Sequence, residues 1–144
     1  MPTGAIEIPP MPLSGTIEAH LHESGGTAPV TLIRTNQDWA VHTSIRLSGA
    51  LSQFISGHWH IHVNLESIGP GGEHTFFDSD CHIPIPEADD TYECVLNVPA
   101  GSVGAGHQGT PYHCAVTVTY RGPLGNPGPI AGYVDMGIVQ FYNV

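Results

Sequence analysis

The chain is broken into short stretches by 18 glycines and 13 prolines, and this punctuation most constrains what it can fold into. No window repeats apolar residues with the helical period of about 3.6 over the length that a long helix needs. Between the breaks, apolar and polar residues alternate with a period of two, which is typical of half-buried β-strands. With 144 residues the chain is long enough for one hydrophobic core. The sequence therefore predicts a single all-β domain.

The alternation is clearest in residues 58–66, where Trp59, Ile61 and Val63 share one face. The predicted strands are residues 16–22, 30–34, 39–47, 58–66, 75–77, 92–98, 112–120 and 133–144, the last bulged at Gly137. Seven to nine strands without helices between them predict an antiparallel β-sandwich over residues 14–144. The first 13 residues are rich in proline and glycine and are predicted to be an extended N-terminal arm. A loop is expected at 78–90 and a turn at 122–129.

A few positions resemble the immunoglobulin-type or fibronectin-III-type sandwich. Trp59 would be the buried tryptophan of strand C. Tyr112 precedes Cys114 by two residues, as the tyrosine of a tyrosine corner precedes the cysteine of strand F, and Tyr92 with Cys94 is a competing match. The resemblance implies the outline of the fold and carries over no function, because this fold hosts many functions.

The resemblance covers residues 39–142 and departs from the family at strand B. An antibody-type domain has its other cysteine there, whereas this chain has no cysteine in residues 44–47. An inter-sheet disulfide of that kind is therefore not expected. Cys94 and Cys114 are predicted to face inward as small core residues, and a disulfide between them is left open.

The charge balance excludes several classes of partner. The chain has 13 acidic residues, three arginines and no lysine, and its formal charge is −10 with histidine neutral. Nucleic acids and anionic membrane surfaces need clustered cations, so neither is an expected partner. No apolar run reaches the roughly 18 residues that span a membrane. Residues 1–10 do not resemble a signal peptide, so we expect a cytoplasmic protein, one exported without a classical signal, or one whose leader was trimmed.

Ten histidines are the most informative feature for function. Protonating all of them would bring the formal charge to about zero, so we expect association or solubility to change between about pH 7.5 and 5.5. Six predicted outward-facing histidines are candidate metal ligands: His20, His22, His42, His58, His60 and His62.

Alternating positions of one strand lie roughly 6.5–7 Å apart, so His58, His60 and His62 share a face. A His-x-His pair can supply two ligands to zinc, copper or nickel. If residues 39–47 pair with residues 58–66, His42 joins that face. The alternative is a surface or subunit-contact role, because solvent-facing positions must be polar. A calcium site at Asp78, Asp80, Asp89 and Asp90 is not expected, since the glycine and glutamate of an EF-hand are missing.

The sequence contains no Gly-x-Ser-x-Gly motif, Walker loop, dinucleotide-binding fingerprint or His-Glu-x-x-His motif. Only 11% of the residues are charged, against about 25% in an average soluble domain, which indicates a surface suited to contacts. We therefore expect a non-enzymatic structural or interaction module that self-associates into a homo-oligomer or larger assembly. Its contacts would use sheet edges, the histidine face and the arm residues Pro9, Pro10 and Pro12. The alternative is a transition-metal-binding β-sandwich.

Overall fold

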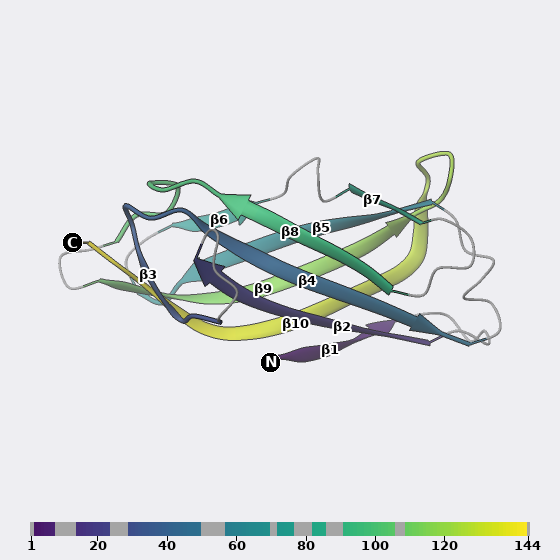
Figure 1. The fold of residues 1–144 in the computed structure, drawn as a ribbon, viewed down its shortest axis with the longest axis horizontal. Coiled ribbons are helices and arrows are strands. Elements are labelled where there is room, and N and C mark those ends of the chain that lie inside the picture. Colours follow the sequence, from purple (N-terminus) through teal and green to yellow (C-terminus); the bar gives the residue numbers. More distant parts are fainter. Residues whose placement is uncertain are drawn as a thin grey trace.

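Ten β-strands and no helix make up the part of the chain that the structure, a computed structural model, describes (Figure 1). The described residues are 2–7, 14–23, 29–49, 57–69, 72–76, 82–85, 91–105 and 109–143. None of them belongs to a helix that would be long and apolar enough to span a membrane. The strands are β1 (Thr3–Glu7), β2 (Ser14–Glu23), β3 (Leu32–Arg34), β4 (Trp39–Ser48), β5 (Gly57–Ser67), β6 (Glu73–Phe76), β7 (His82–Ile85), β8 (Thr91–Val98), β9 (Thr110–Arg121) and β10 (Pro127–Tyr142).

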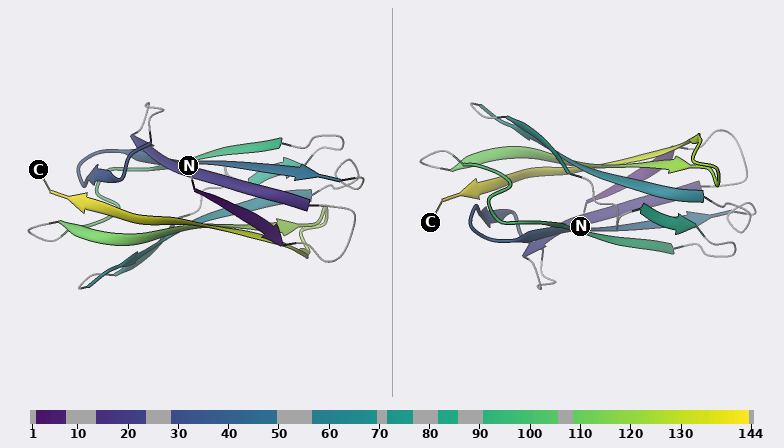
Figure 2. Two further views of the ribbon diagram at one scale, coloured as in Figure 1. Left: turned by 90° about the horizontal axis from the view of Figure 1, so that it is seen from below. Right: turned by 90° about the horizontal axis from the view of Figure 1, so that it is seen from above.

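The strands pair in the order β6-β5-β9-β10-β1-β2-β4-β8, with β7 added beside β5 and β3 beside β10. Every described pairing is antiparallel except that of β3 with β10, which is parallel. Strand β1 pairs with β2 on one side and with β10 on the other, so it joins the two halves of the sheet. The sheet curls until it is nearly closed and barrel-like, and Figure 2 shows its two halves lying over each other.

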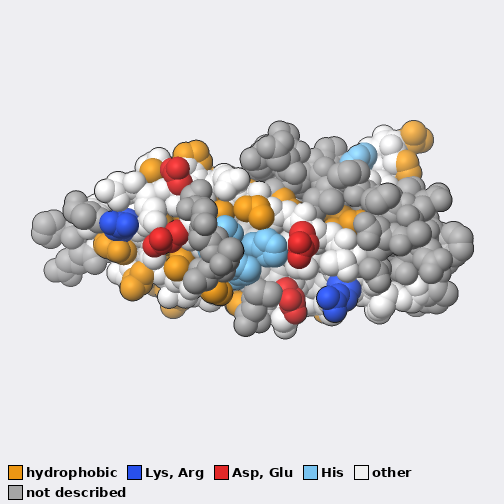
Figure 3. Space-filling view, viewed as in Figure 1, with side chains coloured by type: hydrophobic (Ala, Val, Ile, Leu, Met, Phe, Trp, Pro, Cys, Tyr) orange, Lys and Arg blue, Asp and Glu red, His pale blue; other side chains and the backbone are white. Residues whose placement is uncertain are grey.

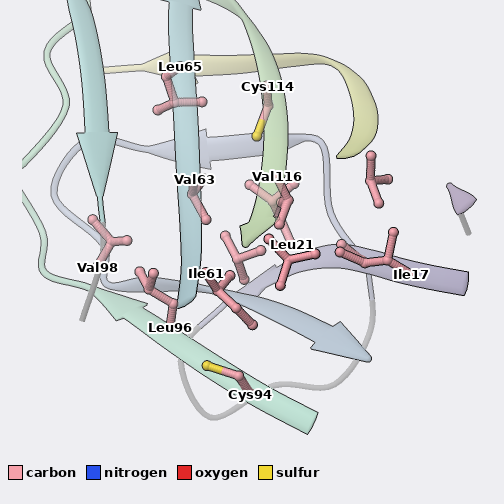
Figure 4. Close-up of a cluster of buried hydrophobic side chains, with 14 of the residues drawn as sticks. Ile17, Leu21, Ile61, Val63, Leu65, Cys94, Leu96, Val98, Cys114 and Val116 are labelled. Carbon is pink, nitrogen blue, oxygen red and sulfur yellow. The ribbon is translucent and has the colours of Figure 1, made fainter. Parts of the chain in front are cut away.

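The core lies between these two halves. Trp59 of β5 meets Tyr92 of β8 with ring centroids 6.0 Å apart, and Trp39 of β4 meets Phe141 of β10 at 5.5 Å. Figure 4 shows buried side chains of β5 and β9 pointing toward those of β2 and β8. The alternation in the sequence predicts these inward faces correctly, and both tryptophans are buried core residues as expected.

The all-β prediction is confirmed, although the structure has ten strands rather than seven to nine. Strand β1 lies in the predicted arm, where Ile6 is the buried side chain that packs into the core. Strand β7 lies in the predicted loop and contains Pro84, which lacks the N–H of a ladder residue and so argues against a strand. Strand β10 begins at Pro127, inside the predicted turn. Its start was missed because a proline there also argues against a strand.

The predicted bulge at Gly137 is confirmed. The register of β10 against β9 shifts between Asp135 and Gly137, and Gly137 has a φ of 76°, which favours glycine. The extra residue reverses the alternation, so Val134 before the bulge and Val139 after it both face the core. After the bulge, even-numbered residues of β10 face outward, and Ile138 is 58% exposed.

Candidate functional site

The predicted histidine face is divided between the two halves of the sheet. The expected pairing of residues 39–47 with residues 58–66 is wrong: β4 pairs with β2 and β8, whereas β5 pairs with β6, β7 and β9. His42 therefore does not lie beside the histidines of β5. The local alternation predicts which way each histidine points and contains no information on which strand becomes its neighbour.

His42 instead joins His20 and His22 in what we call the histidine cluster. His20 of β2 and His42 of β4 are register partners, and their ring centroids are 5.0 Å apart. The His22 ring lies 5.6 Å from that of His20. Figure 3 shows histidine side chains gathered in the middle of this face of the molecule, over β2 and β4.

Burial and neighbouring imidazoles oppose positive charge on His20. Partial burial, then the proximity of His42 and of His22, lowers the pKa of His20. His22 was predicted to face outward, but it is only 8% exposed, and its Nδ1 lies 2.9 Å from the Glu23 carbonyl oxygen, to which it donates. His42 Nε2 lies 4.0 Å from Glu93 Oε1 of β8, and its buried Nδ1 meets no hydrogen-bond partner within the described ranges.

The histidines of β5 lie on the outward face of the other half. His58, His60 and His62 are the register partners of Arg121, Thr119 and Thr117 of β9. Each alternates with a buried residue, as predicted. Within the described part of the chain, no group of three or more histidine, cysteine or acidic side chains has an arrangement that would hold a metal ion. The binding of zinc, copper or nickel by these histidines stays a prediction.

The predicted contact residues of the arm and the acidic residues of the loop, where no calcium site was expected, lie outside the described residues. These are the arm residues Pro9, Pro10 and Pro12 and the loop acids Asp78, Asp80, Asp89 and Asp90.

The structure adds an imidazole–carboxylate pair that the sequence analysis did not identify. His113 Nε2 of β9 lies 2.7 Å from Asp135 Oδ1 of β10. The Asp135 carboxylate also accepts a hydrogen bond from the Gly137 N–H at 2.8 Å. This backbone bond, followed by the bond to His113, lowers the pKa of Asp135. The bulge brings these groups together, and the predicted bulge was the available signal for it.

Cys114 and Cys94 are both buried but differ in their covalent state. Cys114 is free and fully buried, and burial followed by the nearby negative charge of Asp135 raises its pKa to about 12. Cys94 is buried and disulfide-bonded. The disulfide between these two cysteines that the sequence left open is therefore not formed, and Cys114 is the small core residue that was expected.

Large apolar side chains are exposed together where β3 meets the end of β10. Leu32 is 61% exposed and is the register partner of Gln140, which lies between the exposed Ile138 and Tyr142. We call Leu32, Ile138 and Tyr142 the apolar patch. Three large apolar side chains grouped at exposed strand positions make this a candidate contact surface.

Comparison with protein-family models, with curated proteins and with solved structures found no match for the chain. The candidate sites are therefore interpreted from their own geometry.

Proposed function

We propose that this protein is a non-enzymatic interaction module that self-associates through the apolar patch. The observation that carries the proposal is the exposure of Leu32, Ile138 and Tyr142 on two adjacent strands. Burying a Leu or Ile side chain contributes about 1.5–3 kcal/mol, so the patch would supply much of the free energy of a weak contact.

The net charge of the chain makes this association depend on salt concentration. Each chain carries a formal charge of −10, so two copies repel one another at low ionic strength. The apolar patch carries no acidic side chain, and Arg34 of β3 is the register partner of Tyr142. Two chains that meet here would therefore place no carboxylate of the patch against its counterpart. Association should therefore strengthen as salt screens the remaining repulsion.

We also propose that the two halves of the sheet are the layers of a β-sandwich with the outline of an immunoglobulin-type domain. The Tyr112 hydroxyl donates to the Gly104 carbonyl oxygen at 2.8 Å, a bond like that of a tyrosine corner. The neighbours β2, β4 and β8 in one half and β5, β9 and β10 in the other correspond to the A-B-E and C-F-G neighbours of an immunoglobulin-type domain, which supports this proposal. Strand β1, which pairs with both halves, departs from a pair of separate sheets.

Sheet edges remain proposed as further contact surfaces. Strand β8 ends the order of the sheet and contains no lysine or proline, the residues that commonly prevent edge-to-edge pairing.

The proposal is tested by sedimentation velocity across a range of protein and salt concentrations. We expect the wild type to form dimers or larger species, and Leu32→Ser with Ile138→Ser to weaken association at least about tenfold. Leu124→Ser is the matched control, because Leu124 is 89% exposed but lies in the turn before β10. A wild type that stays monomeric at the highest concentration, or a control that weakens association equally, would overturn the proposal.

A further inference from the structure

A polar hollow lies on the outward face of β5, β6, β9 and β10. It has a volume of about 360 Å³, within the range of small-molecule sites. We call it the polar groove. The side chains that give it its chemistry are Asn64, Glu66, Glu73, Thr75, Thr117 and Tyr133.

The groove exists because the outward residues of β9 are small at this point. Ala115 lies opposite Asn64 of β5, and Thr117 lies opposite Tyr133 of β10. The larger side chains of β5 and β10 therefore project further from the sheet than the small side chains of β9 between them. A second hollow of about 320 Å³ shares Thr117 and Tyr133 with the groove and reaches Ala5 of β1, so Tyr133 lines two adjoining recesses.

The groove presents an aromatic ring beside fixed hydrogen-bonding groups. Tyr133 is 49% exposed although it is a large aromatic residue. Asn64 Oδ1 accepts a hydrogen bond from Thr75 Oγ1 at 3.2 Å, which orients the Asn64 amide so that its N–H groups remain for a ligand. At the rim, His113 is held by its 2.7 Å contact with Asp135.

The lining excludes two classes of ligand. It carries the carboxylates of Glu66 and Glu73 beside two histidines and no arginine or lysine, so a phosphate, sulfate or carboxylate would meet like charge there. The carboxylates of Glu66 and Glu73 would lose hydration against a hydrocarbon chain, so an acyl group does not fit. A ligand rich in hydroxyl groups fits both the carboxylates and the Asn64 amide, because hydroxyls donate to carboxylates and accept from amides.

We infer that the polar groove binds a neutral carbohydrate chain, with one sugar ring packed on the Tyr133 ring. The apolar C–H face of a sugar ring covers the aromatic face, and its hydroxyl groups reach Asn64 and Glu66. The adjoining second recess, which shares Thr117 and Tyr133, would extend the site along β9 and β10, which suits an oligosaccharide better than a single sugar. This inference is independent of self-association, since Tyr133 precedes the bulge and the apolar patch residues of β10 follow it.

The test is saturation-transfer difference NMR with neutral hexasaccharides of glucose, mannose and N-acetylglucosamine, and with spermine as a cationic probe. We expect at least one hexasaccharide to bind and Tyr133→Ala to weaken it about tenfold, the loss expected of one aromatic contact. Tyr133→Phe should retain most of the binding. Leu124→Ala is the control, because Leu124 is an 89% exposed apolar residue outside both the groove and the apolar patch. Ala115→Leu, which raises the floor of the groove, should also weaken binding.

Three outcomes would overturn the inference. The first is that no hexasaccharide binds at millimolar concentration. The second is binding that survives both Tyr133→Ala and Ala115→Leu, or that Leu124→Ala weakens as much as Tyr133→Ala does. The third is that spermine binds in the groove and no hexasaccharide does, which would make it a cation site.

Discussion

His20 and His42 face each other across β2 and β4 with their ring centroids 5.0 Å apart, and the pKa of His20 is lowered. Unfolding frees His20 from burial and from its neighbours, so the unfolded chain takes up a proton near pH 6.5 while the folded chain takes it up at lower pH. The contribution to stability is therefore complete above pH 6.5. It decreases as the pH falls below 6.5 toward the lowered pKa.

We predict that the free energy of unfolding, measured in urea at a series of pH values, falls between pH 7.5 and 5.5. His20→Gln should fall less steeply over this range, because it removes the group that the folded state keeps from protonating. His58→Gln, on the other half of the sheet, should keep the slope of the wild type. Equal slopes for wild type and His20→Gln would contradict the prediction.

Thr43 carries a buried hydroxyl. Its side chain is 1% exposed, and Thr43 Oγ1 meets no hydrogen-bond partner among the residues that the structure describes. Thr43→Val replaces the hydroxyl with a methyl group of similar size, so we predict that it stabilises the fold by about 1 kcal/mol. Thr119→Val, at an exposed position of β9, should change stability by less than about 0.5 kcal/mol. Urea unfolding measures both, and a less stable Thr43→Val would refute the prediction.

Gly4 lies where β1 crosses close to β10. A Cβ at this position would overlap the Tyr133 carbonyl oxygen, which belongs to the backbone and has little room to move. We predict that Gly4→Ala destabilises the fold by about 1–3 kcal/mol. Gly72→Ala is the control, because a Cβ there meets nothing within 4 Å. Thermal unfolding compares the two variants, and an equal effect would show that the close approach of β1 is not required.

Cys114 should be chemically inert in the folded protein. Burial, followed by the charge of Asp135, raises its pKa to about 12, and the thiolate is the reactive form. We predict that iodoacetamide at pH 8 leaves Cys114 unmodified in the native protein and modifies it in denaturant. Peptide mass spectrometry reports the modification at this residue. Labelling of the native protein at the rate of the unfolded chain would contradict the assigned burial.

Sequence reasoning predicted the faces of the strands better than their neighbours. The inward positions of Trp39 and Trp59 follow from a period of two, which is a local property that the sequence displays directly. The partners of β4 depend on chain segments far away in the sequence, and for this reason the position of His42 was predicted wrongly. Pairing is decided by which assembly of strands closes the core, and no short window contains that information.

The candidate sites were predictable to different degrees. The proximity of His20 and His22 follows from their spacing on one strand. The pair of His113 and Asp135 and the polar groove combine residues of two to four strands, so they appear only once the register is known. The apolar patch was missed because the sequence predicted a bulge at Gly137 but did not show which residues after it would face outward. The structure shows that Ile138 does.

The bulge at Gly137 has a consequence for how the surface of this protein changes during evolution. The register of β10 against β9 shifts by one residue there, so deleting one residue would restore an unbroken pairing and leave Ile138 outward and Val139 inward. Straightening the bulge at constant chain length would instead exchange the two sides, so that Ile138 would turn inward and Val139 outward. A lineage that loses the extra residue would therefore keep the apolar patch, whereas one that keeps the residue and loses the bulge would lose the patch without substitution of Ile138 or Tyr142.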